Sequence, residues 1–133
     1  MTRPNAVTIR PATITDTSVI HRLITGLAEY ERLADQVTMT EANLRESLFG
    51  ANPAAEVIIA ECDGIPSGFA LFFHNYSTFL GKRGIWLEDL FVEPAFRGRG
   101  VGKQLLVRLA AIARERQRRS CVLRVRASFT KWT

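Results

Sequence analysis

The segment from residue 87 to residue 103 constrains the fold of this chain more than any other part of it. It begins within an expected strand, residues 85–92, which ends at Glu93-Pro94 because proline cannot donate to a strand ladder. A glycine-rich loop then opens a helix, with glycines at positions 98, 100 and 102. Glycine allows close approach of the backbone, and the first amides of a helix have no partner. The loop therefore suits an anion such as a pyrophosphate, and Arg97, Arg99 and Lys103 add positive charge beside it.

Two common phosphate-binding motifs do not fit this loop. A Walker loop needs Ser or Thr after Gly-Lys and a glycine five residues earlier, but Gln104 and Arg97 occupy those positions. A dinucleotide fingerprint fails as well, because Lys103 breaks the glycine spacing and the motif follows four strands instead of one. The alternative is that the glycines only allow the chain to turn and that the loop binds no ligand.

Apolar periodicity predicts secondary-structure elements in the order β-α-α-β-β-β-α-β. The polar segment 15–18 can cap a first helix that runs to about residue 33, and Thr40 begins a second helix that ends at Gly50. Asp63-Gly64 predicts a hairpin, and a further turn is expected at residues 81–84. Strands are expected at 7–12, 55–62, 68–76, 85–92 and 121–125, and a third helix begins near residue 101. We therefore predict an α/β or α+β fold with a mixed sheet.

The size and composition of the chain favour one soluble domain over residues 1–133. Hydrophobic residues make up 47% of the chain and charged residues 23%, which are ordinary values for a globular domain. No apolar run reaches the roughly 20 residues of a membrane helix, and the N-terminus lacks the apolar stretch of a signal peptide. We expect a cytoplasmic protein with no membrane partner.

Cysteine and histidine spacing predicts no metal site. Cys62 and Cys121 show no metal-binding or disulfide spacing and stand in apolar, strand-like segments. His21 and His74 are far apart and lack a Cys or His partner at ligand spacing. We expect two buried, reduced thiols and no metal.

The net charge of +5 is concentrated at the C-terminus. Residues 114–133 hold seven basic residues and one acidic residue, whereas the remainder holds eleven basic and twelve acidic residues. Such a tail can attract polyanions, but it lacks the aromatic interleaving of single-strand binders. We therefore expect no specific nucleic-acid partner.

The glycine loop in its context resembles motif A of the GCN5-related N-acetyltransferase (GNAT) superfamily, Arg/Gln-x-x-Gly-x-Gly/Ala. It reads here Arg97-Gly98-Arg99-Gly100-Val101-Gly102. The start Ile9-Arg10-Pro11-Ala12-Thr13 is typical of the superfamily. Three further segments look like its diamine (spermidine/spermine) acetyltransferase branch: Leu27-Ala28-x-Tyr30-Glu31, Gln36-Val37-x-x-Thr40-Glu41 and Leu87-Glu88-Asp89-x-Phe91-Val92. The resemblance covers roughly residues 7–117 and implies a mixed, mostly antiparallel sheet flanked by helices.

The resemblance implies a site for acetyl-CoA in an opening between the fourth and fifth strands. The backbone of Leu90, Phe91 and Val92 would pair with the pantetheine arm. Amides of the loop would hold the pyrophosphate. The implied cofactor-binding residues are Leu90, Phe91, Val92, Arg97, Gly98, Arg99, Gly100, Val101, Gly102 and Lys103.

The resemblance also implies an amine as acyl acceptor, such as a polyamine or an amino-acid-like amine. A free alkylamine is protonated at neutral pH, so a base must take its proton. Glu88 matches the family position proposed for this base, and strict alternation would point Asp89 to the opposite face. Tyr30 and Glu31 match positions that line the amine site. The alternative for Glu88 is a solvated or salt-bridged carboxylate with no catalytic role. The alternative for Tyr30 and Glu31 is that they are ordinary residues at the end of a helix.

The C-terminus departs from the family. From about residue 118 the chain lacks the family's next helix start, its tyrosine acid and its two closing strands, and the basic charge rises at the same place. We interpret residues 118–133 as a divergent basic tail produced by truncation or a frame shift. An exposed sheet edge would then favour a homodimer. The alternative function is a catalytically inactive protein that binds acetyl-CoA or interacts with a partner.

Overall fold

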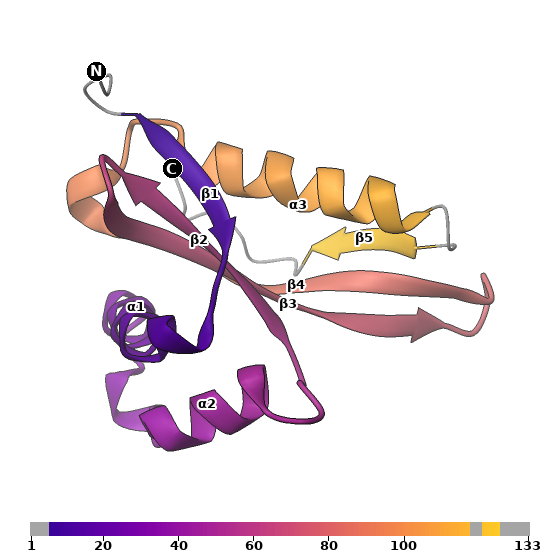
Figure 1. Ribbon diagram of the computed structural model, residues 1–133, viewed down its shortest axis with the longest axis horizontal. Helices are drawn as coiled ribbons and strands as arrows, with labels where there is room; N and C mark the ends of the chain where they lie inside the picture. Colours follow the sequence, from indigo (N-terminus) through magenta and orange to yellow (C-terminus); the bar gives the residue numbers. More distant parts are fainter. Residues whose placement is uncertain (1–5, 118–120, 126–133) are drawn as a thin grey trace.

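The computed structural model describes residues 6–117 and 121–125, which form one five-stranded sheet with helices on both faces (Figure 1). The strands lie in chain order, and the first four are antiparallel neighbours, whereas the fifth runs parallel to the fourth. The mixed, mostly antiparallel sheet and the element order confirm the predicted fold. The strands are β1 (Val7–Pro11), β2 (Glu56–Cys62), β3 (Ile65–Ser77), β4 (Lys82–Val92) and β5 (Cys121–Val125). The rest of the basic tail lies outside the described residues.

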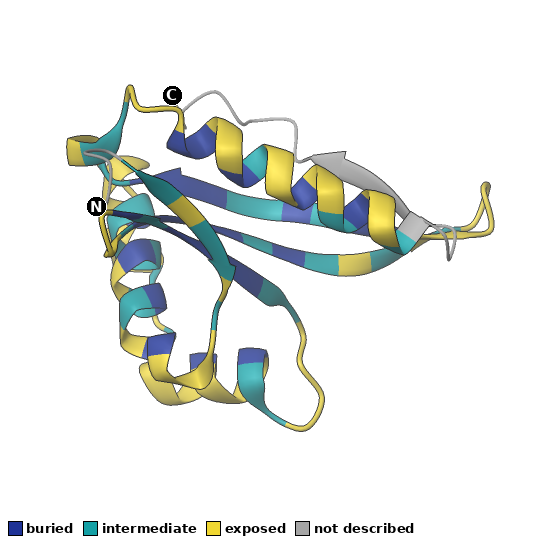
Figure 2. Ribbon diagram, turned by 45° about the horizontal axis from the view of Figure 1, so that its top comes forward, coloured by how far each residue is buried: buried dark blue, intermediate teal, exposed yellow. Residues whose placement is uncertain are grey.

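Helices cover both faces of the sheet and make two separate cores (Figure 2). The helix α3 (Val101–Gln117) packs on one face, and α1 (Thr17–Tyr30) and α2 (Glu41–Phe49) pack on the other. Successive side chains of a strand face opposite sides, so the neighbours Ile58 and Ile59 belong to different cores. Cys62 is buried in the α3 core, as expected, whereas the side chain of Cys121 lies outside the described ones.

The start of α1 is fixed by an ion pair and not by the expected helix cap. Asp16 occupies the N-cap position, but its side chain accepts no hydrogen bond from α1. Its carboxylate instead accepts from Arg10 at 2.8 and 2.9 Å and from the Thr13 amide at 2.7 Å. The Arg10 guanidinium lowers the pKa of Asp16 to about 2. Arg10 also contacts Glu61 at 3.1 Å, so one guanidinium links β1, β2 and the turn before α1.

The second helix has the predicted cap, and the first helix ends early. The Thr40 hydroxyl accepts from the Asn43 amide at 3.1 Å, and the Asn43 side chain accepts from the Thr40 amide at 3.0 Å. This reciprocal pair satisfies two donors at the start of α2. The predicted end of the first helix at residue 33 is wrong. It ends at Tyr30, because the backbone is left-handed at Arg32, with φ 60°.

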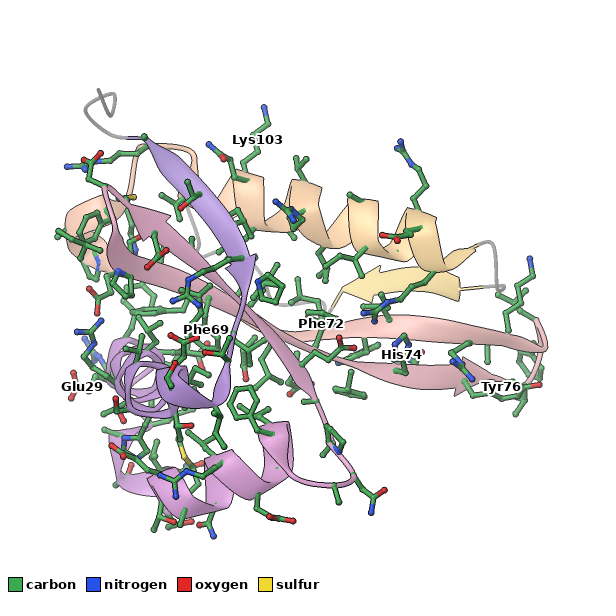
Figure 3. The ribbon with its side chains drawn as sticks, viewed as in Figure 1. Glu29, Phe69, Phe72, His74, Tyr76 and Lys103 are labelled. Atoms are coloured by element: carbon green, nitrogen blue, oxygen red, sulfur yellow. The ribbon has the colours of Figure 1, made fainter. Side chains whose placement is uncertain are left out.

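Two hairpins join the central strands. The β2–β3 turn has positive φ at both Asp63 (52°) and Gly64 (80°), as a tight hairpin on a twisted sheet requires. A turn does join β3 to β4, but it occupies residues 78–81 instead of the predicted 81–84, because Ser77 and Lys82 still pair with each other. The long β3–β4 hairpin therefore projects beyond the rest of the sheet, with Tyr76 near its end (Figure 3).

Candidate active site

A register shift in the β3–β4 ladder places two carboxylates on one face. Leu71 pairs with Asp89 and Phe72 pairs with Leu87, so Glu88 is an extra residue in β4. Leu87 and Leu90 both pack in the α3 core, so the two residues between them face the other side, toward α1 and α2. The expectation that Asp89 points away from Glu88 is therefore wrong, because the bulge breaks strict alternation.

The end of β4 extends past the described end of β5. The β4–β5 register runs from Arg83 opposite Cys121 to Leu87 opposite Val125, and β4 continues to Val92. Over its last residues β4 pairs with β3, whose Gly68 lies opposite Val92. Leu90, Phe91 and Val92 are buried, with at most 4% of each residue's surface exposed.

The predicted glycine loop borders a hollow at the start of α3. Two left-handed residues shape the loop, Gly98 with φ 81° and Gly100 with φ 77°. The first helical bond runs from the Gln104 amide to the Gly100 carbonyl at 3.0 Å, so the amides before Gln104 have no acceptor within the helix. The hollow measures about 340 Å³ and is lined by Val92, Arg97, Gly98, Gly100, Val101, Gly102 and Lys103. Seven of the ten predicted cofactor-binding residues thus meet at one helix N-terminus.

The predicted cations differ in whether they contribute positive charge to this hollow. Lys103 lies on the first turn of α3, and its side chain extends into solvent away from the sheet (Figure 3). The Arg99 guanidinium lies 5.4 Å from the centroid of the Phe96 ring and is not part of the lining. The helix N-terminus and Lys103 together favour an anion here.

Arg97 turns back from the loop toward α1. Its Nε donates to the Val92 carbonyl at 2.8 Å, and its guanidinium lies 4.4 Å from the centroid of the Tyr30 ring and 5.6 Å from that of Phe91. The Nη2 atom is buried and has no hydrogen-bond partner among the described residues. A residue predicted to bind the cofactor therefore contacts one predicted to bind the amine. Glu31, the other predicted amine-site residue, is exposed directly after Tyr30 at the end of α1.

Sequence reasoning missed one partner of Glu88. The indole Nε1 of Trp86 donates to Oε2 of Glu88 at 2.9 Å. The i, i+2 spacing on a strand could have suggested this contact, since such residues share a face.

A larger hollow of about 520 Å³ lies between α2 and the sheet, but none of the predicted site residues line it.

No cluster of three His, Cys, Asp or Glu side chains with metal-binding spacing occurs among residues 6–117 and 121–125. Over the same residues, none of the helices is long and apolar enough to span a bilayer.

Residues 20–131 match the sequence profile of the Acetyltransferase (GNAT) family. The chain is 40% identical to a thialysine N-epsilon-acetyltransferase of Bos taurus over 115 residues, which cover 80% of this chain and 67% of that protein. It is 31% identical to an L-ornithine N5-acetyltransferase of Arabidopsis thaliana, covering 77% of this chain and 64% of the relative. The chain thus spans about two thirds of the length of these relatives.

Solved structures share the fold. A ribosomal-protein-alanine N-acetyltransferase from Brucella melitensis superposes with a TM-score of 0.74 at 26% identity, covering 94% of this chain and 82% of that one. An aminoglycoside acetyltransferase in complex with sisomicin gives a TM-score of 0.75 at 16% identity, covering 92% and 78%. The second likeness concerns the fold alone.

Proposed function

This chain belongs to the acetyltransferase (GNAT) family, and we propose that it transfers an acetyl group from acetyl-CoA to a small-molecule amine. The relatives named for thialysine, spermidine/spermine and L-ornithine support the diamine branch expected from the sequence. One observation carries the proposal. The hollow at the start of α3 and the carboxylates of Glu88 and Asp89, which share one face of β4, belong to the same short stretch of chain, residues 88–103.

The residues present fit a CoA pyrophosphate. The amides before Gln104 lack acceptors within the helix, and Gly98 and Gly100 have open space where a Cβ would stand. Lys103 supplies a cation beside these amides. Each of these features favours a group with two phosphates over a neutral ligand.

The end of β4 fits the pantetheine arm. Leu90 to Val92 continue β4 past Leu87, the last residue of its described pairing with β5, so we assign the pantetheine arm to this stretch of backbone. The Val92 carbonyl is engaged by Arg97, which fixes the last residue of the strand. When bound, acetyl-CoA supplies the acetyl group as an activated thioester.

Glu88 is the proposed base. The acceptor amine is protonated at neutral pH and must lose a proton before it attacks the thioester carbon. The bulge turns the Glu88 carboxylate toward the α1 and α2 side. There it can take that proton directly or through one water.

The amine site is proposed on the same side of the sheet. We assign to it Asp89, which lies on that face of β4, and Tyr30 and Glu31, which lie at the end of α1. Carboxylates of this kind attract a cationic substrate, so a polyamine or an amino-acid-like diamine fits better than an acidic amine. The Tyr30 ring also supports Arg97, which links this site to the loop.

We also propose a homodimer. Tyr76, Phe79 and Leu80 are 66%, 101% and 53% exposed at the end of the β3–β4 hairpin. Clustered apolar side chains on a projecting hairpin are typical of an interaction surface. Sedimentation equilibrium tests this assignment, and a monomer at every concentration would refute it.

The transfer itself is tested with a panel of amines. Purified protein is incubated with acetyl-CoA and either spermidine, L-ornithine or thialysine, and acetylated amine is measured by mass spectrometry. We expect product with at least one of these amines. Glu88→Gln should slow the reaction by about 100-fold or more, as expected for loss of a general base. Glu115→Gln, on the exposed face of α3, is the matched control and should have no effect.

The same experiment separates the two candidate functions. Acetyl-CoA binding without acetylation of any amine would show a binding protein instead of an enzyme. Turnover that is unchanged in Glu88→Gln would refute the base assignment but not the proposed acetyl transfer.

A further inference from the structure

Trp86 and Glu88 form a donor–acceptor pair on one face of β4. The indole Nε1–H donates to Oε2 of Glu88 at 2.9 Å, and both residues are half-buried. Indole nitrogen can only donate, so this bond requires an acceptor and suits an ionised carboxylate. A hydrogen bond of this kind fixes the orientation of the carboxylate as well as its position.

The two residues differ in how firmly the sheet holds their backbones. Trp86 pairs with Phe73 of β3 on one side and with Arg124 of β5 on the other. Glu88 follows Leu87, the last β4 residue of the described β4–β5 register, and is the extra residue of the bulge. The donor thus stands on doubly paired backbone, and the acceptor stands where the ladder is interrupted.

We propose that Trp86 is a positioning residue that holds the Glu88 carboxylate for proton transfer. This inference rests on the proposed function, in which Glu88 accepts the proton of the amine. The bond to Trp86 is made through Oε2 of the carboxylate. Trp86 therefore fixes the orientation of the carboxylate plane from one of its oxygens.

A purely structural role for Trp86 makes a different prediction. Trp86 is half-buried and is not among the residues of either core in the described part of the chain. If the ring acted only by packing, its replacement would slow the enzyme whether or not residue 88 carried a carboxylate. If it acts through Glu88, its effect vanishes once that carboxylate is gone.

A double-mutant cycle of Trp86→Phe and Glu88→Gln makes this distinction. Phenylalanine keeps an aromatic ring and removes the N–H donor. Kinetics are measured with spermidine, or with the best amine of the panel. We expect Trp86→Phe to lower kcat by about 10-fold or more, as for a lost hydrogen bond to a charged group. The KM for acetyl-CoA should stay within twofold. In the Glu88→Gln background, Trp86→Phe should change kcat by less than twofold.

The outcomes separate this inference from the proposed function. If Glu88→Gln is impaired and Trp86→Phe is not, the positioning role is refuted and the function stands. An equal loss from Trp86→Phe in both backgrounds would also refute positioning in favour of packing. If Glu88→Gln retains full activity, both the base assignment and the inference built on it fail. Urea unfolding of each variant checks that all of the proteins compared in the kinetics are folded.

Discussion

The Arg97 guanidinium lies 4.4 Å from the centroid of the Tyr30 ring, which joins the loop before α3 to the end of α1. The Nε of the same guanidinium holds the Val92 carbonyl at 2.8 Å. One side chain therefore connects the end of β4, the proposed pyrophosphate loop and the proposed amine site. Substitutions at the end of α1 should consequently change the affinity for acetyl-CoA.

Tyr30→Ala should weaken the binding of acetyl-CoA by about 2- to 5-fold. The reason is the loss of the cation–π contact, which is worth about 0.5–1 kcal/mol at a partly exposed site. Tyr30→Phe keeps the ring and should bind acetyl-CoA as the unaltered protein does. Calorimetric titration of the three proteins measures this difference. Equal affinities for all three would show that the ring does not support Arg97.

Gly68→Ala should destabilise the protein by about 1–3 kcal/mol, as overpacking does. A Cβ at Gly68 would stand 2.7 Å from the Phe91 carbonyl oxygen, so one of the two strands must shift. Because that carbonyl belongs to the proposed pantetheine-binding stretch, the affinity for acetyl-CoA should fall as well. Urea unfolding and titration of the same variant measure both effects. Unchanged stability would mean that β3 and β4 leave room for a methyl group at this position.

The Arg10–Asp16 pair should make stability depend on acid pH. The pKa of Asp16 is lowered from 3.8 to about 2 by Arg10, so the folded state favours the ionised carboxylate. Its stabilisation is present above about pH 4 and is lost as the pH falls through 2, whereas Arg10 stays charged. The unfolding free energies of the unaltered protein and Asp16→Asn should therefore differ at pH 7 and converge toward pH 2. A constant difference over this range would contradict the assignment.

Local signals in the sequence predict much of the fold. The cap at Thr40, the hairpin at Asp63-Gly64 and the loop before α3 each depend on residues close in the chain. Their geometry follows from side-chain hydrogen bonding or from backbone freedom, so a short window of sequence is enough. The same holds for the helix N-terminus at Gly100, because the glycine spacing and the apolar helix that follows it together predict an anion site.

Long-range contacts and pairing register are not predictable in the same way. The bulge at Glu88 depends on how β3 and β4 pair, although the Leu87-x-x-Leu90 spacing hints at it. The sequence predicts that Arg97 adds charge to the loop, but tertiary packing directs its guanidinium toward Tyr30. The predicted cap of the first helix is wrong because Arg10, six residues before Asp16, competes for its carboxylate.

Calorimetric titration of acetyl-CoA into the unaltered protein, Gly100→Ala and Gly64→Ala tests whether the loop before α3 binds the cofactor. Gly100 (φ 77°) and Gly64 (φ 80°) are both left-handed with open space at Cβ, so either substitution strains the backbone by about 1–2 kcal/mol. Of these two glycines, only Gly100 borders the hollow at α3. We expect saturable binding that weakens by about 10-fold in Gly100→Ala and is unchanged in Gly64→Ala. The absence of binding to the unaltered protein, or equal affinity in all three, would contradict this expectation.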